Sequence, residues 1–136
     1  MANTMNLEIV TPGAVVYSKA VEMVTMPAAD GQIGVYPQHV PLLTRITPGE
    51  IIVRIDGHEE FLAVGAGLVE VTGDQVAIVT DMAVAARDID EAKVEEARQR
   101  AAARLQDKIS DEEVASVNAS LARSLAQLNV KRRRRP

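Results

Sequence analysis

The sequence predicts a mainly β fold with a helical end: an N-terminal antiparallel β-sandwich or flattened barrel followed by a C-terminal antiparallel two-helix hairpin. Between residues 7 and 80, turn residues interrupt short β-branched runs about every ten positions, and no helix-length pattern intervenes. Beyond Arg87 the apolar period becomes helical. The charge changes at the same point, because residues 1–87 carry four basic and ten acidic side chains whereas residues 88–136 carry eleven and nine. We therefore divide the chain into a β domain, 1–87, and a helical domain with a basic tail, 88–136.

The predicted strands end at turn signals. The first stops at the Pro-Gly pair at 12–13, and a later one stops at the Asp-Gly pair at 56–57. Proline lacks the amide donor that a strand needs, and glycine reaches turn conformations at little steric cost. The predicted strand runs are 7–11, 21–26, 51–55, 61–64, 68–71 and 76–79.

Two helix starts are predicted in the second domain. Asp88 precedes Glu91 by three residues and Ser110 precedes Glu113 by three, so each pair has the spacing of a capping box. The first helix should run to about residue 107 and the second to about residue 129. Because their connection is short, the helices should fold back on each other. The apolar face predicted for the second helix comprises Val114, Val117, Leu121, Leu125 and Leu128.

The hairpin is rich in alanine, with nine alanines between Ala92 and Ala126. Small side chains let two helices approach closely but remove little apolar area from water. Each alanine contact therefore contributes far less than the ~1.5–3 kcal/mol of a buried leucine. We expect the hairpin to leave a surface without a large cost in free energy.

Composition excludes several classes of function. Aromatic residues make up 2% of the chain, so it has no stacking platform for single-stranded nucleic acid. The absence of cysteine excludes disulfides, a thiolate nucleophile and a sulfur-ligated metal. No apolar run approaches the ~20 residues of a membrane span, and the first residues lack the pattern of a signal peptide. These features predict a soluble intracellular protein.

Catalytic and metal-binding chemistry has few candidates. His39 and His58 are the only imidazoles, and the HEE segment at 58–60 lacks the second histidine of a zinc-protease helix. The GAG segment at 65–67 is not followed by the helix that a dinucleotide site requires. No GxxxxGK[ST] phosphate loop occurs. The sequence therefore predicts no catalytic residue, no metal site and no cofactor, and a protein that is not an enzyme by itself.

The chain ends in the basic run KRRRRP at 131–136. Cations after a helix interact with the negative end of its dipole and otherwise stay solvated. A run of cations can also hold an acidic partner. Nucleic acid is the less favoured partner, because the β domain is acidic and no aromatic platform or reading helix accompanies the tail.

Four stretches together resemble a known family: VTPG at 10–13, VEMVTMPAADGQIGVYPQHVPLLTRITPG at 21–49, GLVEV at 67–71 and the alanine-rich charged hairpin. Over nearly the whole chain they resemble the epsilon subunit of F-type ATP synthases. The resemblance implies a non-catalytic rotor subunit of the central stalk that binds the gamma subunit and rests on the c-ring. It implies coupling of proton-driven rotation to ATP synthesis, and a hairpin that can restrain ATP hydrolysis. It also implies a monomer when isolated, peripheral to the cytoplasmic face of a bacterial inner membrane.

The resemblance places the turn at 31–39 at the end of the sandwich that faces the c-ring. Gln32 and His39 are implied as contact residues, whereas glycine and proline in this segment restrict its shape. The alternative is that His39 only pins the loop through an internal hydrogen bond. The full set implied for c-ring and gamma docking is Gln32, Ile33, Gly34, Tyr36 and His39.

Some bacterial members bind ATP through an [IL]DxxRA motif, which corresponds here to residues 89–94. Asp90 is kept, Lys93 replaces the arginine and lacks its planar fork, and Arg100 matches a further family arginine. Val84 occupies a position that is acidic in the best-known ATP binders. We expect ATP to be at most a weak regulatory ligand here. Two alternatives remain: Asp90 only caps the helix, or the chain is an ATP-sensing module.

The resemblance also implies that the second helix contacts an acidic segment of the catalytic beta subunit in the inhibitory state. Arg123 matches a basic family position, whereas Ala122 and Gln127 replace others. We expect the tail to compensate for them; alternatively it only solubilises the chain, or makes it an adaptor for nucleic acid. The residues implied for the catalytic-head contact are Arg123, Lys131, Arg132, Arg133, Arg134 and Arg135.

Overall fold

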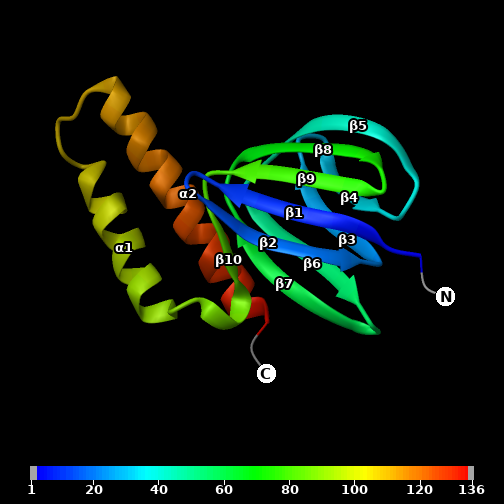
Figure 1. Ribbon diagram of the computed structural model, residues 1–136. Helices are drawn as coiled ribbons and strands as arrows, with labels where there is room; N and C mark the ends of the chain where they lie inside the picture. The colour runs from blue at the N-terminus through cyan, green and yellow to red at the C-terminus, as the bar shows by residue number, and fades with distance from the viewer. Residues whose placement is uncertain (1–2, 135–136) are drawn as a thin grey trace.

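The computed structural model describes residues 3–134 and confirms the predicted fold class (Figure 1). Within these residues, ten strands form a nearly closed β-sandwich and two helices form a hairpin that projects from one end of it. The strands are β1 (Met5–Thr11), β2 (Ala14–Val21), β3 (Met23–Ala28), β4 (Gly31–Val35), β5 (His39–Ile46), β6 (Gly49–Ile55), β7 (His58–Val64), β8 (Gly67–Gly73), β9 (Gln75–Thr80) and β10 (Ala83–Ala85). A short 3₁₀ turn, η1 (Ala86–Asp88), leads into the helices α1 (Glu91–Arg104) and α2 (Asp111–Arg133).

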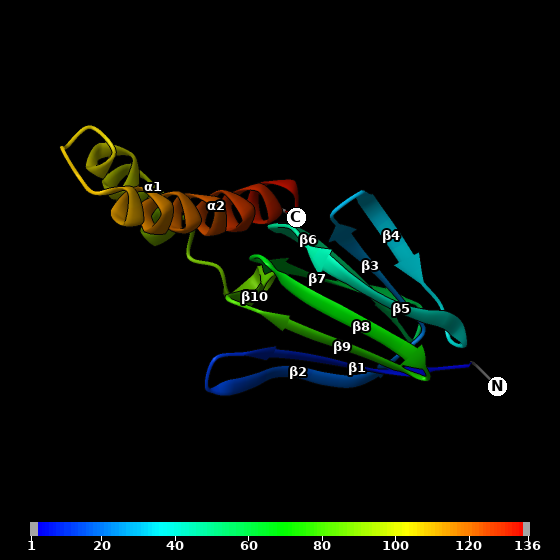
Figure 2. The same ribbon diagram turned by 90° about the horizontal axis from the view of Figure 1, so that it is seen from above.

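The strands follow the order β10-β7-β6-β3-β5-β8-β9-β1-β2, with β4 paired to β3. The pair β1 and β9 is parallel, and the other ladders are antiparallel. Figure 2 shows β1, β2, β8 and β9 on one side and β3, β4 and β6 on the other. Where β2 faces β7, the Tyr17 hydroxyl donates to the Glu60 carboxylate at 2.7 Å and Lys19 approaches the same group at 3.2 Å. These polar contacts close the seam between the two strands.

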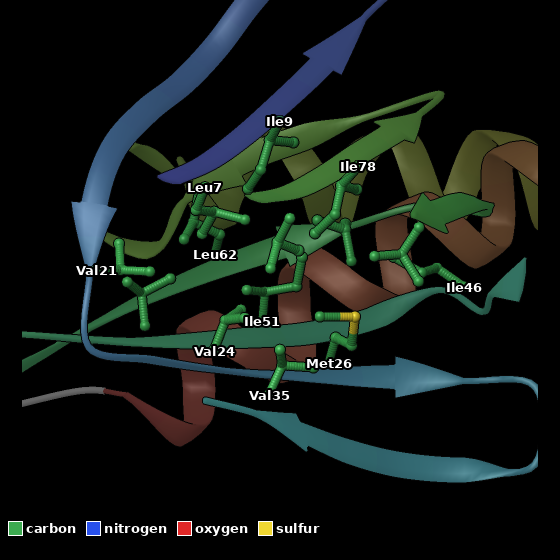
Figure 3. Packing of buried hydrophobic residues seen from close by; sticks show 14 of the residues in the cluster. Leu7, Ile9, Val21, Val24, Met26, Val35, Ile46, Ile51, Leu62 and Ile78 are labelled. Carbon is green, nitrogen blue, oxygen red and sulfur yellow. The ribbon is translucent and has the colours of Figure 1, made fainter. Parts of the chain in front are cut away.

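The core is built from aliphatic side chains and methionine. Along β1 the buried positions alternate, so that Met5, Leu7 and Ile9 face inward. In Figure 3, Leu7 and Ile9 point into the space between the layers, toward Ile51 and Met26 from the other side. Burying each such side chain stabilises the fold by ~1.5–3 kcal/mol. The sandwich therefore has a core of its own, independent of the hairpin.

The strand predictions are correct for the buried strands and incomplete elsewhere. The predicted strand at 21–26 joins the last residue of β2 to β3 across a bend at Glu22. β2 was not predicted because it is an edge strand whose side chains are mostly exposed, so it lacks the usual alternation. β4, β5 and the short β10 were also missed. In β5, Pro41 lies where the register with β8 shifts, between His39 and Leu42.

The first predicted capping box is wrong. Asp88 ends η1, and the N-cap of α1 is Asp90, whose carboxylate accepts the Lys93 amide at 3.2 Å. The second box is confirmed, because the Ser110 hydroxyl accepts the Glu113 amide at 3.2 Å. The helix ends also differ from the prediction, since α1 stops at Arg104 and α2 continues to Arg133. Much of the basic run is therefore helical.

The hairpin contacts the sandwich mainly through α2. The predicted apolar face of α2 is partly correct: Leu128 is buried, and Val114, Val117 and Leu121 are half-buried. Leu125 was predicted on this face but is 45% exposed. At that point the face buried by α2 has shifted to the small side chains of Ser124 and Ala126.

Candidate functional site

The segment expected to be a docking turn is largely strand. Gly31–Val35 forms β4 and pairs with β3, so the connection before β5 is only residues 36–38. Gln32 therefore lies near the start of β4, whereas His39 begins β5 beyond the other end of that strand, so the two residues are not on one turn. Ile33 packs against the sandwich core, whereas the position of Gly34 is close to Met23.

The connection from β4 to β5 lies at the end of the sandwich away from the hairpin (Figure 2). Gln38 has a positive φ of 67°, and its backbone amide donates to the backbone carbonyl of Gly73 at 3.2 Å. The Nδ1 atom of His39 lies 2.7 Å from the carbonyl oxygen of Val40, which is the internal hydrogen bond that the alternative interpretation requires. Tyr36 is 56% exposed and Val40 is 71% exposed, so this end also offers apolar surface.

An exposed apolar row crosses four strands of the sandwich. Leu68 on β8 lies opposite Val79 on β9, Val79 lies opposite Val10 on β1, and Val10 lies opposite Val15 on β2. Leu68, Val79 and Val15 are each more than half exposed. We call Leu68, Val79, Val10 and Val15 the apolar row. Aliphatic side chains placed side by side on an outer sheet face are typical of a protein contact surface.

A second, smaller core joins the hairpin to the sandwich. Val130 of α2 and Ile89 are buried against Ala63 of β7, with Phe61 and Val94 packed around them. This core is apolar on both sides, so hydrophobic burial contributes to holding the hairpin in place.

A polar contact flanks this core. Arg123 of α2 donates to Asp81 at 3.1 Å and to the Ser120 hydroxyl at 3.0 Å. Asp81 fits because Gly65 has no side chain: a Cβ there would lie 1.8 Å from the position of Asp81 Oδ1. The glycine at 65 thus serves close packing, a role that the sequence did not predict.

The basic tail folds back onto the chain. Arg132 donates to Glu91 at 2.8 Å and to Glu95 at 3.3 Å, which ties α2 to α1. Lys131 donates to the carbonyl of Ala86 at 3.2 Å. The predicted site residue Arg135 lies outside the described residues.

Arg133 and Arg134 both bind one carboxylate of the sandwich. Arg134 donates through Nε and Nη2 to the two oxygens of Glu50, at 2.8 and 2.7 Å, and Arg133 adds a contact of 3.2 Å. The Arg134 guanidinium also lies 4.0 Å from the ring centroid of Phe61. The hydrogen bonds to Glu50 raise the pKa of Arg134. The sequence did not identify Glu50 as a site residue, because its role depends on pairing with two arginines of the tail that are distant in the chain.

The residues expected to bind nucleotide have local structural roles. Asp90 caps α1, and Arg100 pairs with Glu96 of the same helix at 2.9 Å. Lys93 is exposed. A groove of about 690 Å³ between β2, β7 and η1 is lined by Tyr17, Glu60 and Arg87, and none of the expected nucleotide-binding residues lines it.

The pKa values of two groups in that groove are shifted. The hydroxyl of Tyr17 lowers the pKa of Glu60, which also lies near Lys19 and Arg87. Burial and the bond to Glu60 raise the pKa of Tyr17. No group of three or more His, Asp or Glu side chains that could hold a metal ion occurs within residues 3–134. Over the same residues, neither helix has the length and apolarity needed to cross a membrane.

Family models match both parts of the chain. The β-sandwich domain of the ATP synthase delta/epsilon chain matches residues 4–86, and the long α-helix domain of the same chain matches residues 87–132. The chain belongs to the ATP synthase delta/epsilon chain family. The two family domains meet at η1, where the sandwich passes into the hairpin.

Relatives in this family align over most of their length. The ATP synthase epsilon chains of Laribacter hongkongensis and Halorhodospira halophila are each 41% identical over 128 residues, covering 93% of this chain and 91% of each relative. A chain of the Euglena gracilis mitochondrial ATP synthase structure, which contains OSCP, F1 and the c-ring, superposes with a TM-score of 0.75 at 21% identity. That match covers 93% of this chain and 79% of the other.

A second structure shares the fold. A chain of the Tetrahymena thermophila mitochondrial ATP synthase central stalk and c-ring superposes with a TM-score of 0.62 at 14% identity, covering 95% of this chain and 97% of that one. The fold of this chain is thus shared with both structures at low sequence identity.

Proposed function

We propose that this chain is the epsilon subunit of an F-type ATP synthase, a non-catalytic rotor subunit that couples c-ring rotation to ATP synthesis through the gamma subunit. Support comes from the family match over both domains and from relatives named as epsilon chains. As part of that complex it lies peripheral to the membrane, at the cytoplasmic face of a bacterial inner membrane. It binds no nucleic acid and is a monomer when isolated.

The observation that carries this proposal is the apolar row. A rotor subunit needs a rigid surface that stays attached to its shaft, and a sheet face with its own core supplies one. The row lies across β8, β9, β1 and β2, none of which depends on the hairpin for its core. We assign the row to gamma.

The c-ring contact lies at the end of the sandwich away from the hairpin. Tyr36 and Val40 supply exposed apolar surface there, and His39 lies between them in the chain. The short connection at 36–38 is held by the bond from Gln38 to Gly73, so little conformational entropy is lost when it docks. Gln32, at the other end of β4, reaches the ring only if the contact extends along that strand.

The hairpin supplies regulation. When it leaves the sandwich, Arg123 and the tail cations become free to bind the acidic segment of the beta subunit, and they restrain ATP hydrolysis there. ATP is at most a weak ligand of the hairpin, because Asp90 is engaged as a helix cap and Arg100 as a partner of Glu96.

The gamma contact can be tested by making the apolar row polar. Threonine at both Leu68 and Val79 keeps the β propensity but removes apolar area from the contact. We expect the double variant to bind a gamma-containing catalytic head lacking epsilon about thirtyfold more weakly, a loss of about 2 kcal/mol. Binding is measured by titration of the labelled full chain.

The matched control is Leu125→Gln, which removes a similarly exposed leucine from the hairpin instead of the sandwich. This variant should keep its affinity for the head. Equal affinity of the Leu68→Thr, Val79→Thr double variant and the unmodified chain would rule out the row as the gamma surface.

A further inference from the structure

The carboxylate of Glu50 is nearly buried at the joint between sandwich and hairpin. Its side chain is 7% exposed, and it is the second residue of β6, which begins at Gly49 just after Pro48. Among residues 3–134, its hydrogen bonds and ion pairs all come from Arg133 and Arg134. A charged group this buried is stable only when it is paired. Its pairing therefore depends on the last turn of α2 staying in place.

The contact to Arg134 has the geometry of a strong ion pair. Two parallel hydrogen bonds join the planar guanidinium to the two carboxylate oxygens of Glu50. Such forked pairs are more specific and stronger than a single exposed pair. Stacking on Phe61 fixes the guanidinium on a second side, and only 27% of the Arg134 side chain remains exposed.

The position of this contact gives it control over the hairpin. α1 packs chiefly on α2, and α2 carries the contacts with β6, β7 and η1. The contact between the two helices is alanine-rich, and it need not break if the hairpin moves as a unit. Release therefore requires breaking the small core around Val130 and three polar contacts: the Arg123 to Asp81 pair, the bond from Lys131 to the Ala86 carbonyl and the contacts of Glu50.

We propose that Glu50, Arg133 and Arg134 form a latch that holds the C-terminal end of α2 on the sandwich and sets how often the hairpin leaves it. The latch borders a groove of about 390 Å³ between α2 and the start of β6, which Glu50 and Arg133 both line. A partner surface rich in carboxylates competes with Glu50 for the same two guanidinium groups. That competition rests on the proposed function, whereas the latch itself rests on the geometry of this chain.

The neighbouring arginine provides a matched control. Arg132 lies in the same helical turn but binds Glu91 and Glu95 of α1, so its contacts stay inside the hairpin. Arg132→Gln removes one charge from the same tail without touching the latch. A general effect of tail charge would appear in this variant, and a latch effect would not.

Hairpin release can be measured on the isolated full chain by cysteine alkylation. The natural sequence has no cysteine, so a single introduced thiol reports without interference. Ala126→Cys places it at the contact of α2 with the sandwich, where the native side chain is 5% exposed. Val69→Cys places it in the sandwich core, where the native side chain is fully buried. The first thiol reacts when the hairpin leaves and the second only when the sandwich opens.

We expect Glu50→Gln to raise the alkylation rate at position 126 about tenfold, the change that ~1.4 kcal/mol produces. The rate at position 69 should stay within about twofold, since the glutamine side chain has nearly the same shape and the sandwich core is separate. The Arg133→Gln, Arg134→Gln double variant should give at least as large an increase, because it leaves the buried Glu50 carboxylate without its partners. Adding Glu50→Gln to it should produce little further change, because coupled partners are not additive.

Three results would overturn the latch: an unchanged rate at position 126 in Glu50→Gln, an equal increase in Arg132→Gln, or fully additive increases in the triple variant. A parallel increase at position 69 would also count against it, because it would show loss of the sandwich and not release of the hairpin. The assay contains no gamma or ring subunit. Failure of the latch is therefore distinguishable from failure of the rotor assignment, which the apolar-row variants test.

Discussion

Two glycines allow backbone and side-chain approaches that no other residue would permit. At Gly65 the neighbour is the Asp81 carboxylate, which can move, whereas at Gly67 a Cβ would lie 2.0 Å from the backbone carbonyl oxygen of Val79, which cannot. The approach at Gly65 positions the Asp81 carboxylate, which accepts a hydrogen bond from Arg123, and so it affects how the hairpin docks on the sandwich. The second concerns the pairing of β8 with β9.

Gly65→Ala should destabilise the chain by about 1–3 kcal/mol, because the added methyl group displaces the Asp81 carboxylate and breaks its pair with Arg123. Chemical denaturation of the isolated chain measures the loss. The same substitution in an Asp81→Ala background should cost much less, since the clashing atoms are gone. No side-chain substitution should reduce the cost of Gly67→Ala in this way, because the clashing atom belongs to the backbone of Val79. Equal costs of Gly65→Ala in the two backgrounds would refute this account.

Residues whose role depends on local sequence were easier to predict than residues that pair over long distances. Ser110 was identified from its spacing to Glu113 alone. Asp88 was wrongly predicted as a cap from its spacing to Glu91, whereas the alternative that Asp90 caps the helix is confirmed. Glu50 carries no local signal, since its partners lie more than 80 residues away.

At the scale of elements, buried strands were predictable and edge strands were not. β1, β6, β8 and β9 alternate because one face is covered, which leaves the pattern in the sequence. β2 and β4 expose most of their side chains, so their sequences lack the alternation of apolar and polar residues that predicts a strand. The docking segment was expected to be a turn because glycine and proline cluster in it and because the family resemblance places a turn there.

The cap of α1 gives a test at this scale. Asp90→Ala should raise amide exchange in the first turn of α1 by about fivefold, since losing an N-cap costs about 1 kcal/mol. Asp90→Asn should retain most of the protection, because asparagine caps as well. Asp88→Ala should leave the exchange unchanged. Hydrogen exchange by NMR resolves these amides. A larger increase in exchange from Asp88→Ala than from Asp90→Ala would mean that Asp88 is the cap, as the sequence predicted.

For the whole molecule, the same cations serve two alternative positions of the hairpin. In the docked form Arg123 binds Asp81 and the last arginines bind Glu50. In the proposed inhibitory form these side chains face the catalytic head. The alanine-rich hairpin makes exchange between the two forms inexpensive, and the sandwich core stays intact in both. A shift between such forms requires only a few kcal/mol of differential contact.

This arrangement predicts opposite effects from two changes at one joint in the assembled synthase. Truncation after Val130 removes the latch and, apart from Arg123, the cations that reach the head, so it should raise ATP hydrolysis, more strongly at low salt where charges are less screened. Glu50→Gln removes only the latch and leaves every tail cation free to reach the head, so it should lower ATP hydrolysis by about twofold or more, as the inhibitory form becomes more populated. Steady-state ATP hydrolysis by complexes reconstituted with each variant measures both effects. If both variants changed the rate in the same direction, the tail could not be acting both as a latch and as a contact with the head.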